Sequence, residues 1–141
     1  MIHQNRLRIF IECLDNYKLD IPLSKYLKEF FKRNKQMGSR DRKSLSHMMY
    51  AYFRIGNLGL NYSIEERLMM ALLLVANDDY KLLSIFKPEW IEHQTKSTSE
   101  KLAFLKSVHS DLNSEDIFPL KNQVSSKINV DEYLNSHFIQ P

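Results

Sequence analysis

Residues that interrupt regular secondary structure are unusually scarce in this chain, which holds 3 glycines and 4 prolines among 141 residues. Between these few breaks, apolar and charged residues alternate at intervals of three and four, the spacing of one face of an α-helix. Such a pattern is typical of an all-helical protein. We therefore expect an all-α fold, a compact bundle of six to seven helices that forms a single domain over residues 1–141.

The first two helices are predicted over residues 5–16 and 23–35. The YKLDIP segment separates them, because the residue before Pro22 disfavours helical geometry. Gly38 is expected to end the second helix by adopting a positive φ. The expected inner face of that helix is formed by Leu23, Leu27, Phe30 and Phe31.

A third helix is predicted directly after Gly38. Ser39 or Asp41 can cap its start by accepting hydrogen bonds from free backbone N–H groups. Gly56 and Gly59 are expected to end it in a tight loop. Its core stripe follows the helical repeat and comprises Leu45, Met48, Met49, Tyr52 and Phe53.

The most apolar segment of the chain, IEERLMMALLLVAN, is predicted to be a central and enclosed helix. Ser63 and Glu66 have the spacing of a capping box at its start. Trp90, in the KPEW turn, is expected to anchor a loop onto the bundle. The remaining expected elements are a short helix over 78–86, a helix from Thr98 or Ser99 to about 109, a single turn near Glu115–Phe118 and a last short helix over 130–138.

Basic residues are concentrated in one part of the chain. Residues 25–54 contain nine Lys and Arg against two acids, a net charge of +7, whereas the whole chain carries +3 and the rest therefore −4. A lysine stripe on the outer face of the second helix contributes Lys25, Lys28, Lys32 and Lys35. This asymmetry indicates a surface for a polyanion such as RNA, although a lysine stripe is also typical of an ordinary solvated helix face.

The turn GSRDR adds groups suited to phosphate. Arg40 and Arg42 can bind phosphate oxygens in a bidentate manner, and backbone N–H groups near Ser39 can bind a phosphate at the start of the helix. Tyr50 can stack on an unpaired base or pack at the edge of the core. Asp41 is expected to be a cap or the partner of a nearby arginine.

The chain lacks the common signatures of a catalytic centre. It has no GxGxxG or GxxxxGK loop, its five histidines are scattered, and Cys13 is a lone cysteine expected to be a buried structural thiol. We expect no catalytic, cofactor-binding or metal-binding residues here. The apolar run Leu68–Ala76 is too short to cross a bilayer and no signal peptide is recognised, so we expect no membrane partner and a cytoplasmic location.

The run NKQMGSRDRKSLSHMMYAYFRIG resembles the N-terminal helical domain of the RsmB/NOP/Sun family of RNA cytosine-5 methyltransferases. That domain is similar to the all-helical RNA-binding factor NusB, so the resemblance implies a NusB-like fold and an RNA partner, ribosomal RNA above all. It also implies a methyltransferase domain that follows in the same protein and uses S-adenosylmethionine. The catalytic Pro-Cys dipeptide of the family has no counterpart in this chain.

The leading hypothesis is therefore an RNA-binding, substrate-positioning domain of a longer rRNA methyltransferase. The residues expected to contact RNA are Lys28, Lys32, Lys35, Arg40, Arg42, Lys43 and Arg54. Two alternatives stay open. The basic face can dock an acidic protein or the methyltransferase domain itself, or the chain can be a stand-alone NusB-like antitermination factor.

Overall fold

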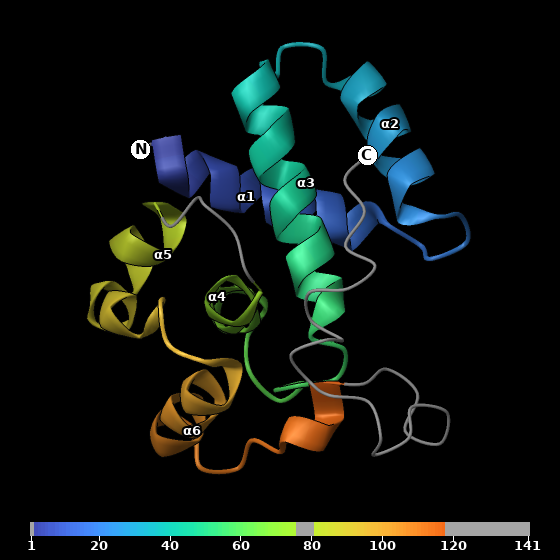
Figure 1. The fold of residues 1–141 in the computed structure, drawn as a ribbon. Coiled ribbons are helices and arrows are strands. Elements are labelled where there is room, and N and C mark those ends of the chain that lie inside the picture. Colours follow the sequence, from blue (N-terminus) through green and yellow to red (C-terminus); the bar gives the residue numbers. More distant parts are fainter. Residues whose placement is uncertain (1, 76–80, 118–141) are drawn as a thin grey trace. The chain divides into compact units, whose positions relative to one another are not determined.

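A computed structural model describes residues 2–75 and 81–117 of the chain, and the regular secondary structure of these residues is helical, with no β-strand among them (Figure 1). The described part contains six α-helices and two 3-10 helices, which confirms the all-α prediction. The chain divides into two compact units. The N-terminal unit extends through Tyr50 and the C-terminal unit begins at Ala51.

The N-terminal unit is built from α1 (Ile2–Asn16), α2 (Leu23–Arg33) and the larger part of α3 (Ser39–Arg54). Figure 1 shows α1 crossing α3 while α2 lies beside α3. The hydroxyl of Tyr26 donates to the carbonyl oxygen of Cys13 at 2.7 Å and so ties α2 to α1. The buried apolar residues of this unit are Phe10, Cys13, Tyr26, Leu27, Phe30, Met37, Leu45, Met48 and Met49.

Cys13 is the buried structural thiol that the sequence predicts. Its side chain is fully buried, and burial raises the pKa of the thiol to about 12. Because only the thiolate is an effective nucleophile, this raised pKa makes the thiol a weak nucleophile at neutral pH.

The link between α2 and α3 differs from the prediction at Gly38. Helix α2 already ends at Arg33, where the backbone N–H of Asn34 donates to the carbonyl oxygen of Phe31. Gly38 does not have a positive φ; instead its carbonyl accepts from the N–H of Arg42 at 3.0 Å and so opens α3. The expectation that Gly38 ends the second helix was therefore wrong, because this glycine lies at the start of the next one.

The C-terminal unit is organised around α4 (Ile64–Leu74), which is buried from Arg67 to Leu74 as expected for the most apolar segment. α4 packs against α5 (Lys81–Phe86) and α6 (Thr98–Val108). The 3-10 helix η1 (Pro88–His93) packs against the same two helices, and η2 (Ser114–Ile117) forms the predicted single turn. The predicted helix over 130–138 lies outside the described residues.

Serine side chains cap the starts of α4 and α6 in this unit. Ser63 caps α4 by accepting from the N–H of Glu66 at 3.1 Å, but the Glu66 carboxylate bonds elsewhere, so the reciprocal half of the predicted box is missing. The complete capping box lies at α6, between Ser97 and Glu100. The helix begins at Thr98, one of the two predicted starts, and Ser97 is its cap.

The loop after α3 is held by Arg67, which is 6% exposed. Its guanidinium donates to the carbonyl oxygens of Gly56 and Leu58 at 2.7 and 3.0 Å and to the hydroxyl of Tyr52 at 2.7 Å. Gly56 and Gly59 both have positive φ, as a tight loop requires.

Trp90 is the predicted loop anchor. Its side chain is 2% exposed and its ring meets that of Phe104 edge-on, with centroids 5.7 Å apart. No helix in the described ranges, 2–75 and 81–117, combines the length and the apolar character needed to span a membrane.

Candidate nucleic-acid interface

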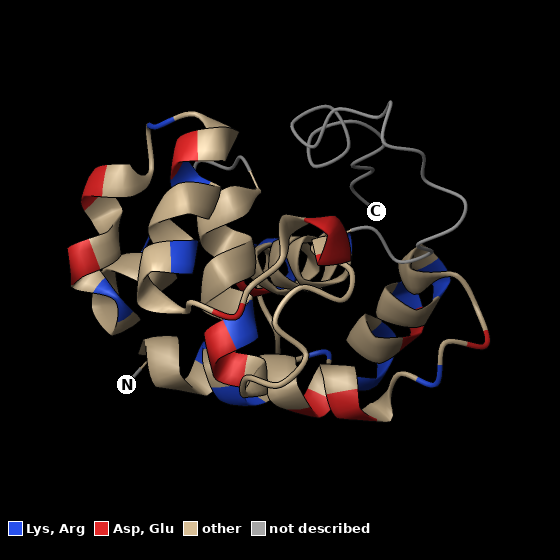
Figure 2. Cartoon of the chain, turned by 90° about the horizontal axis from the view of Figure 1, so that it is seen from below, with Lys and Arg blue, Asp and Glu red and all other residues tan. Residues whose placement is uncertain are grey.

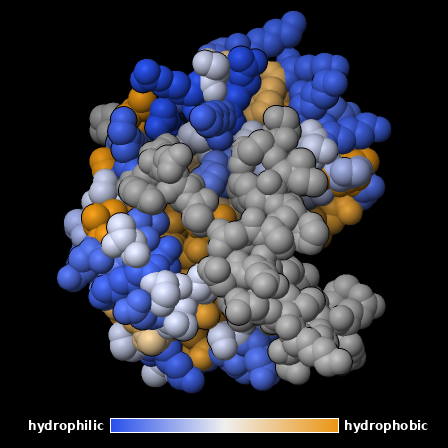
Figure 3. All heavy atoms as spheres, viewed as in Figure 1, coloured by the Kyte–Doolittle hydropathy of each residue, from blue (hydrophilic) through white to orange (hydrophobic). Residues whose placement is uncertain are grey.

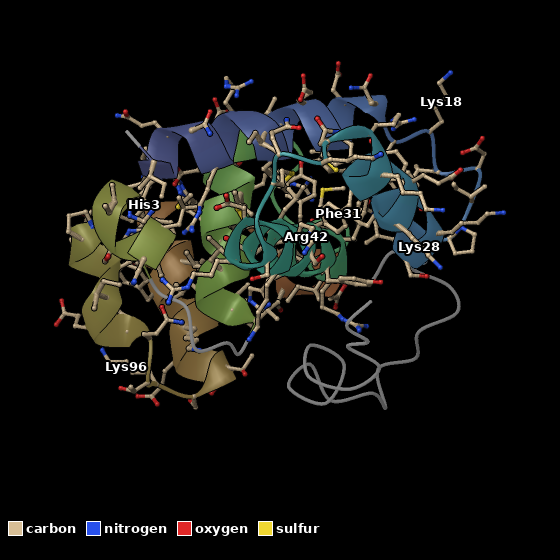
Figure 4. The ribbon with its side chains drawn as sticks, turned by 90° about the horizontal axis from the view of Figure 1, so that it is seen from above. His3, Lys18, Lys28, Phe31, Arg42 and Lys96 are labelled. Carbon is tan, nitrogen blue, oxygen red and sulfur yellow. The ribbon has the colours of Figure 1, made fainter. Side chains whose placement is uncertain are left out.

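An open groove of about 870 Å³ lies within the N-terminal unit, between α2 and α3. Both helices supply its walls, and the residues are Ser24, Lys25, Lys28, Phe31, Arg42, Lys43 and Ser46. Figure 4 shows Lys28 and Phe31 on α2 and Arg42 on α3 at this part of the unit. The groove therefore brings together basic residues that are distant in sequence.

Helical periodicity explains why these side chains share one groove. On α2, Ser24, Lys28 and Phe31 follow at intervals of four and three and so lie on one face. On α3, Arg42 and Ser46 are separated by four residues and lie on one face as well. The neighbouring faces of the two helices carry the buried residues, among them Leu27, Phe30, Leu45 and Met49.

The groove has a positive charge with no compensating acid in its lining. Lys25, Lys28, Arg42 and Lys43 are all exposed, and among the described residues none that lines the groove is acidic. No ion pair joins these four side chains to a carboxylate in the described part of the chain. Cations lining a concave surface raise the local concentration of an anionic ligand.

The acid next to Arg42 in the sequence, Asp41, forms an ion pair with α1. Nε of Arg6, on α1, lies 3.2 Å from Oδ1 of Asp41 on α3. This pair confirms the prediction that Asp41 is the partner of an arginine. The next two residues, Arg42 and Lys43, line the groove.

Phe31 contributes the aromatic surface of the groove. Its side chain is half-buried, and its ring meets Phe30 edge-on with centroids 6.3 Å apart. The sequence assigned Phe31 to the inner face of α2, but the structure buries Phe30 and leaves part of Phe31 in the groove. The two adjacent rings therefore have different environments, which spacing alone did not separate.

Tyr50 lies at the core edge and does not line the groove. Burial raises the pKa of Tyr50, and a hydrogen bond with Ser24 opposes that rise. Of the two interpretations that the sequence left open, packing at the core edge describes its position. The aromatic group that borders the basic residues is Phe31.

The predicted RNA-binding residues fall into two groups. Lys28, Arg42 and Lys43 line the groove. Outside it lie Lys32, Lys35 and Arg40, which are exposed on the N-terminal unit, and Arg54, which is half-buried at the end of α3 in the C-terminal unit. Lys25 lines the groove but was absent from the predicted set, although the lysine stripe already contained it.

Hydrophilic side chains gather over the part of the N-terminal unit where α2 and α3 are joined (Figure 3). Ser39 and Arg40, at the start of α3, are exposed there. They do not line the groove, so the predicted phosphate contact through the backbone N–H groups of this helix start stays a prediction.

A second cluster of charged groups lies in the C-terminal unit and is internally neutralised. Oε1 of Glu66 lies 2.9 Å from Nζ of Lys87, and its Oε2 lies 2.8 Å from Nε2 of His109. Burial opposes ionisation of Glu66, but the hydrogen bonds and charges of Lys87 and His109 outweigh it, so the pKa of this carboxyl is lowered. The cluster links α4 to the residues that follow α5 and α6, and so it joins parts of the fold to one another.

Among the described residues, no group of three or more His, Cys, Asp and Glu side chains is placed to hold a metal ion. Comparisons with protein-family models, with characterised proteins and with solved structures gave no match to this chain. The candidate interface therefore rests on its own geometry and charge.

Proposed function

We propose that the groove between α2 and α3 binds the phosphate backbone of RNA. The observation that supports this best is the joining of four exposed cations from two helices in one groove that no acid lines. A chain of phosphates needs several cations spaced along a surface, and each neutralised phosphate adds to affinity by releasing counterions.

The arginine and the lysines of the groove have different roles in phosphate binding. Arg42 presents a planar guanidinium that can take two phosphate oxygens at once, which fixes the orientation of the strand. Lys25, Lys28 and Lys43 act as mobile point charges that tolerate differences in backbone conformation. Contacts of this kind position an RNA without selecting its sequence.

The resemblance to RNA cytosine-5 methyltransferases suggests what the positioning serves. In that family a separate domain carries the catalytic cysteines and binds S-adenosylmethionine. We propose that this chain has the corresponding role of holding the substrate RNA, most simply ribosomal RNA, for such a domain. The chemistry of methyl transfer is not assigned to any residue of this chain.

A pair of double variants tests whether the groove is the site. Arg42→Ala with Lys43→Ala removes two groove cations, and Lys32→Ala with Lys35→Ala removes two cations outside it. We expect the groove variant to weaken binding of a fluorescent single-stranded RNA about tenfold or more, and the outer variant less than about threefold, as measured by anisotropy at one salt concentration.

Equal losses in the two variants would show that the charge of the segment, rather than the groove, governs binding. If RNA does not bind at all while an acidic polypeptide binds in a way that depends on Arg42 and Lys43, the partner is a protein. Circular dichroism of each variant verifies that the helices are retained.

A further inference from the structure

Phe31 is the feature of the groove that phosphate binding does not explain. A phosphate backbone has no apolar surface, yet a half-buried aromatic ring lies among Lys28, Arg42 and Lys43. Apolar surface exposed to water carries a free-energy cost, which is recovered when a flat apolar group covers it. The bases of a nucleic acid are such groups, and they are attached to the phosphates that the cations attract.

The groove is large enough for part of a nucleic-acid strand, and stacking favours an unpaired one. Its volume of about 870 Å³ falls within the range of about 300–1,000 Å³ typical of clefts for small organic ligands. A nucleotide or two can enter such a space. In a duplex the bases are stacked on each other and their flat faces are hidden, so only an unpaired base can reach the ring.

Polar groups beside the ring can bond to the edge of a base or to a ribose. Ser46, on α3, is 4% exposed and lines the groove near the cations. Ser24 lines the opposite wall on α2 and has a hydrogen bond with Tyr50 that holds it in place. An apolar surface with a few fixed polar groups is the usual composition of a ligand site.

From this arrangement we infer that the groove binds single-stranded RNA with one unstacked base packed on Phe31, while Lys28, Arg42 and Lys43 hold the adjoining phosphates. The inference rests on the proposed function and adds that the ligand is unpaired RNA and that base stacking contributes to affinity. Stacking on an aromatic side chain accepts any of the four bases.

The test combines a change in the protein with a change in the ligand. Three RNA ligands of about ten nucleotides are compared by anisotropy: a single strand, the same strand in a duplex, and a strand of abasic ribose phosphates. The proteins are the unchanged chain, Phe31→Leu, Phe31→Tyr, and Phe53→Leu as a matched change at another half-buried phenylalanine.

We expect the unchanged chain to bind the single strand about tenfold more tightly than the abasic strand or the duplex. Phe31→Leu should lose about that factor on the single strand and nothing on the abasic strand, whereas Phe31→Tyr and Phe53→Leu should behave as the unchanged chain. This pattern isolates the contact between the ring and the base from the charge contacts and from folding.

Equal affinity of the unchanged chain for the single strand and the abasic strand overturns the inference and leaves phosphate binding intact. The same holds if Phe31→Leu weakens binding of both ligands equally. Failure to bind any of the three ligands overturns the proposed function itself, so the two failures are distinguishable.

Discussion

Gly56 has a φ of 60°, and a Cβ added there would lie 1.9 Å from the carbonyl oxygen of Ile117. The obstructing atom belongs to a backbone and cannot move aside, and the left-handed conformation is itself unfavourable for other residues. The backbone N–H of the next residue, Asn57, donates to the carbonyl of Asp116 at 2.7 Å, which holds the two segments together. This position therefore requires glycine for two independent reasons.

We expect Gly56→Ala to lower the free energy of unfolding by about 2–4 kcal/mol in urea denaturation. Gly38→Ala is the matched control, because its φ is not positive and no described atom lies within 4 Å of the added Cβ. Its effect should stay within about 0.5 kcal/mol. Similar losses for the two variants would show that the close approach to Ile117 does not determine stability.

Arg67 is a residue whose role the sequence could not reveal. It stands at the start of an apolar helix, where an arginine is ordinarily read as a surface residue. In the structure it is buried, and its guanidinium donates to the backbone carbonyls of Gly56 and Leu58, which lie in the loop between α3 and α4. Only the tertiary fold brings that loop to the guanidinium, so local spacing contained no signal for it.

At the scale of the helices, the salt bridges of Glu66 link the start of α4 to Lys87 and His109. The pKa of Glu66 is lowered in the folded protein, so its contribution to stability is complete above the unfolded-state pKa of about 4.3 and is lost as the pH falls below it. The relevant window therefore lies on the acid side of pH 5.

Glu66→Gln should lower the free energy of unfolding by about 1 kcal/mol at neutral pH, and this difference from the unchanged chain should shrink as the pH falls from about 5 to about 3. Urea denaturation at a series of pH values measures it. Glu65→Gln, an exposed neighbour, is the control. A difference that is constant over the whole range would show that the charge of Glu66 has no part in stability.

Most helices could be predicted because their signals are local. The apolar spacing located α1 to α4 to within a few residues, and the enclosed position of α4 followed from its composition. The links between helices were predicted less well. Gly38 was misassigned because a residue between two helices can end the first or begin the second, and the choice depends on how the chain arrives from the preceding element.

At the scale of the whole molecule, the distribution of charge was predictable and the shape of the site was not. The excess of Lys and Arg in residues 25–54 is a property of the sequence, and Figure 2 shows the same bias along α2. Which of those cations share a groove depends on how α2 and α3 are arranged in space. For that reason Lys25 was missed, while Lys32, Lys35 and Arg40 were expected at the site but lie outside its lining.

The salt dependence of RNA binding tests the central proposal most directly, because it counts the phosphates that the protein neutralises. Each contact with a single strand contributes a slope of about −0.7 to the plot of log affinity against log salt concentration, so four groove cations predict about −3. Lys28→Ala with Arg42→Ala should reduce that slope by about 1.4, whereas Lys18→Ala with Lys106→Ala, both exposed and outside the groove, should leave it unchanged. A slope near zero in the unchanged chain, or the same slope in both double variants, would contradict the assignment of the groove as the RNA-binding site.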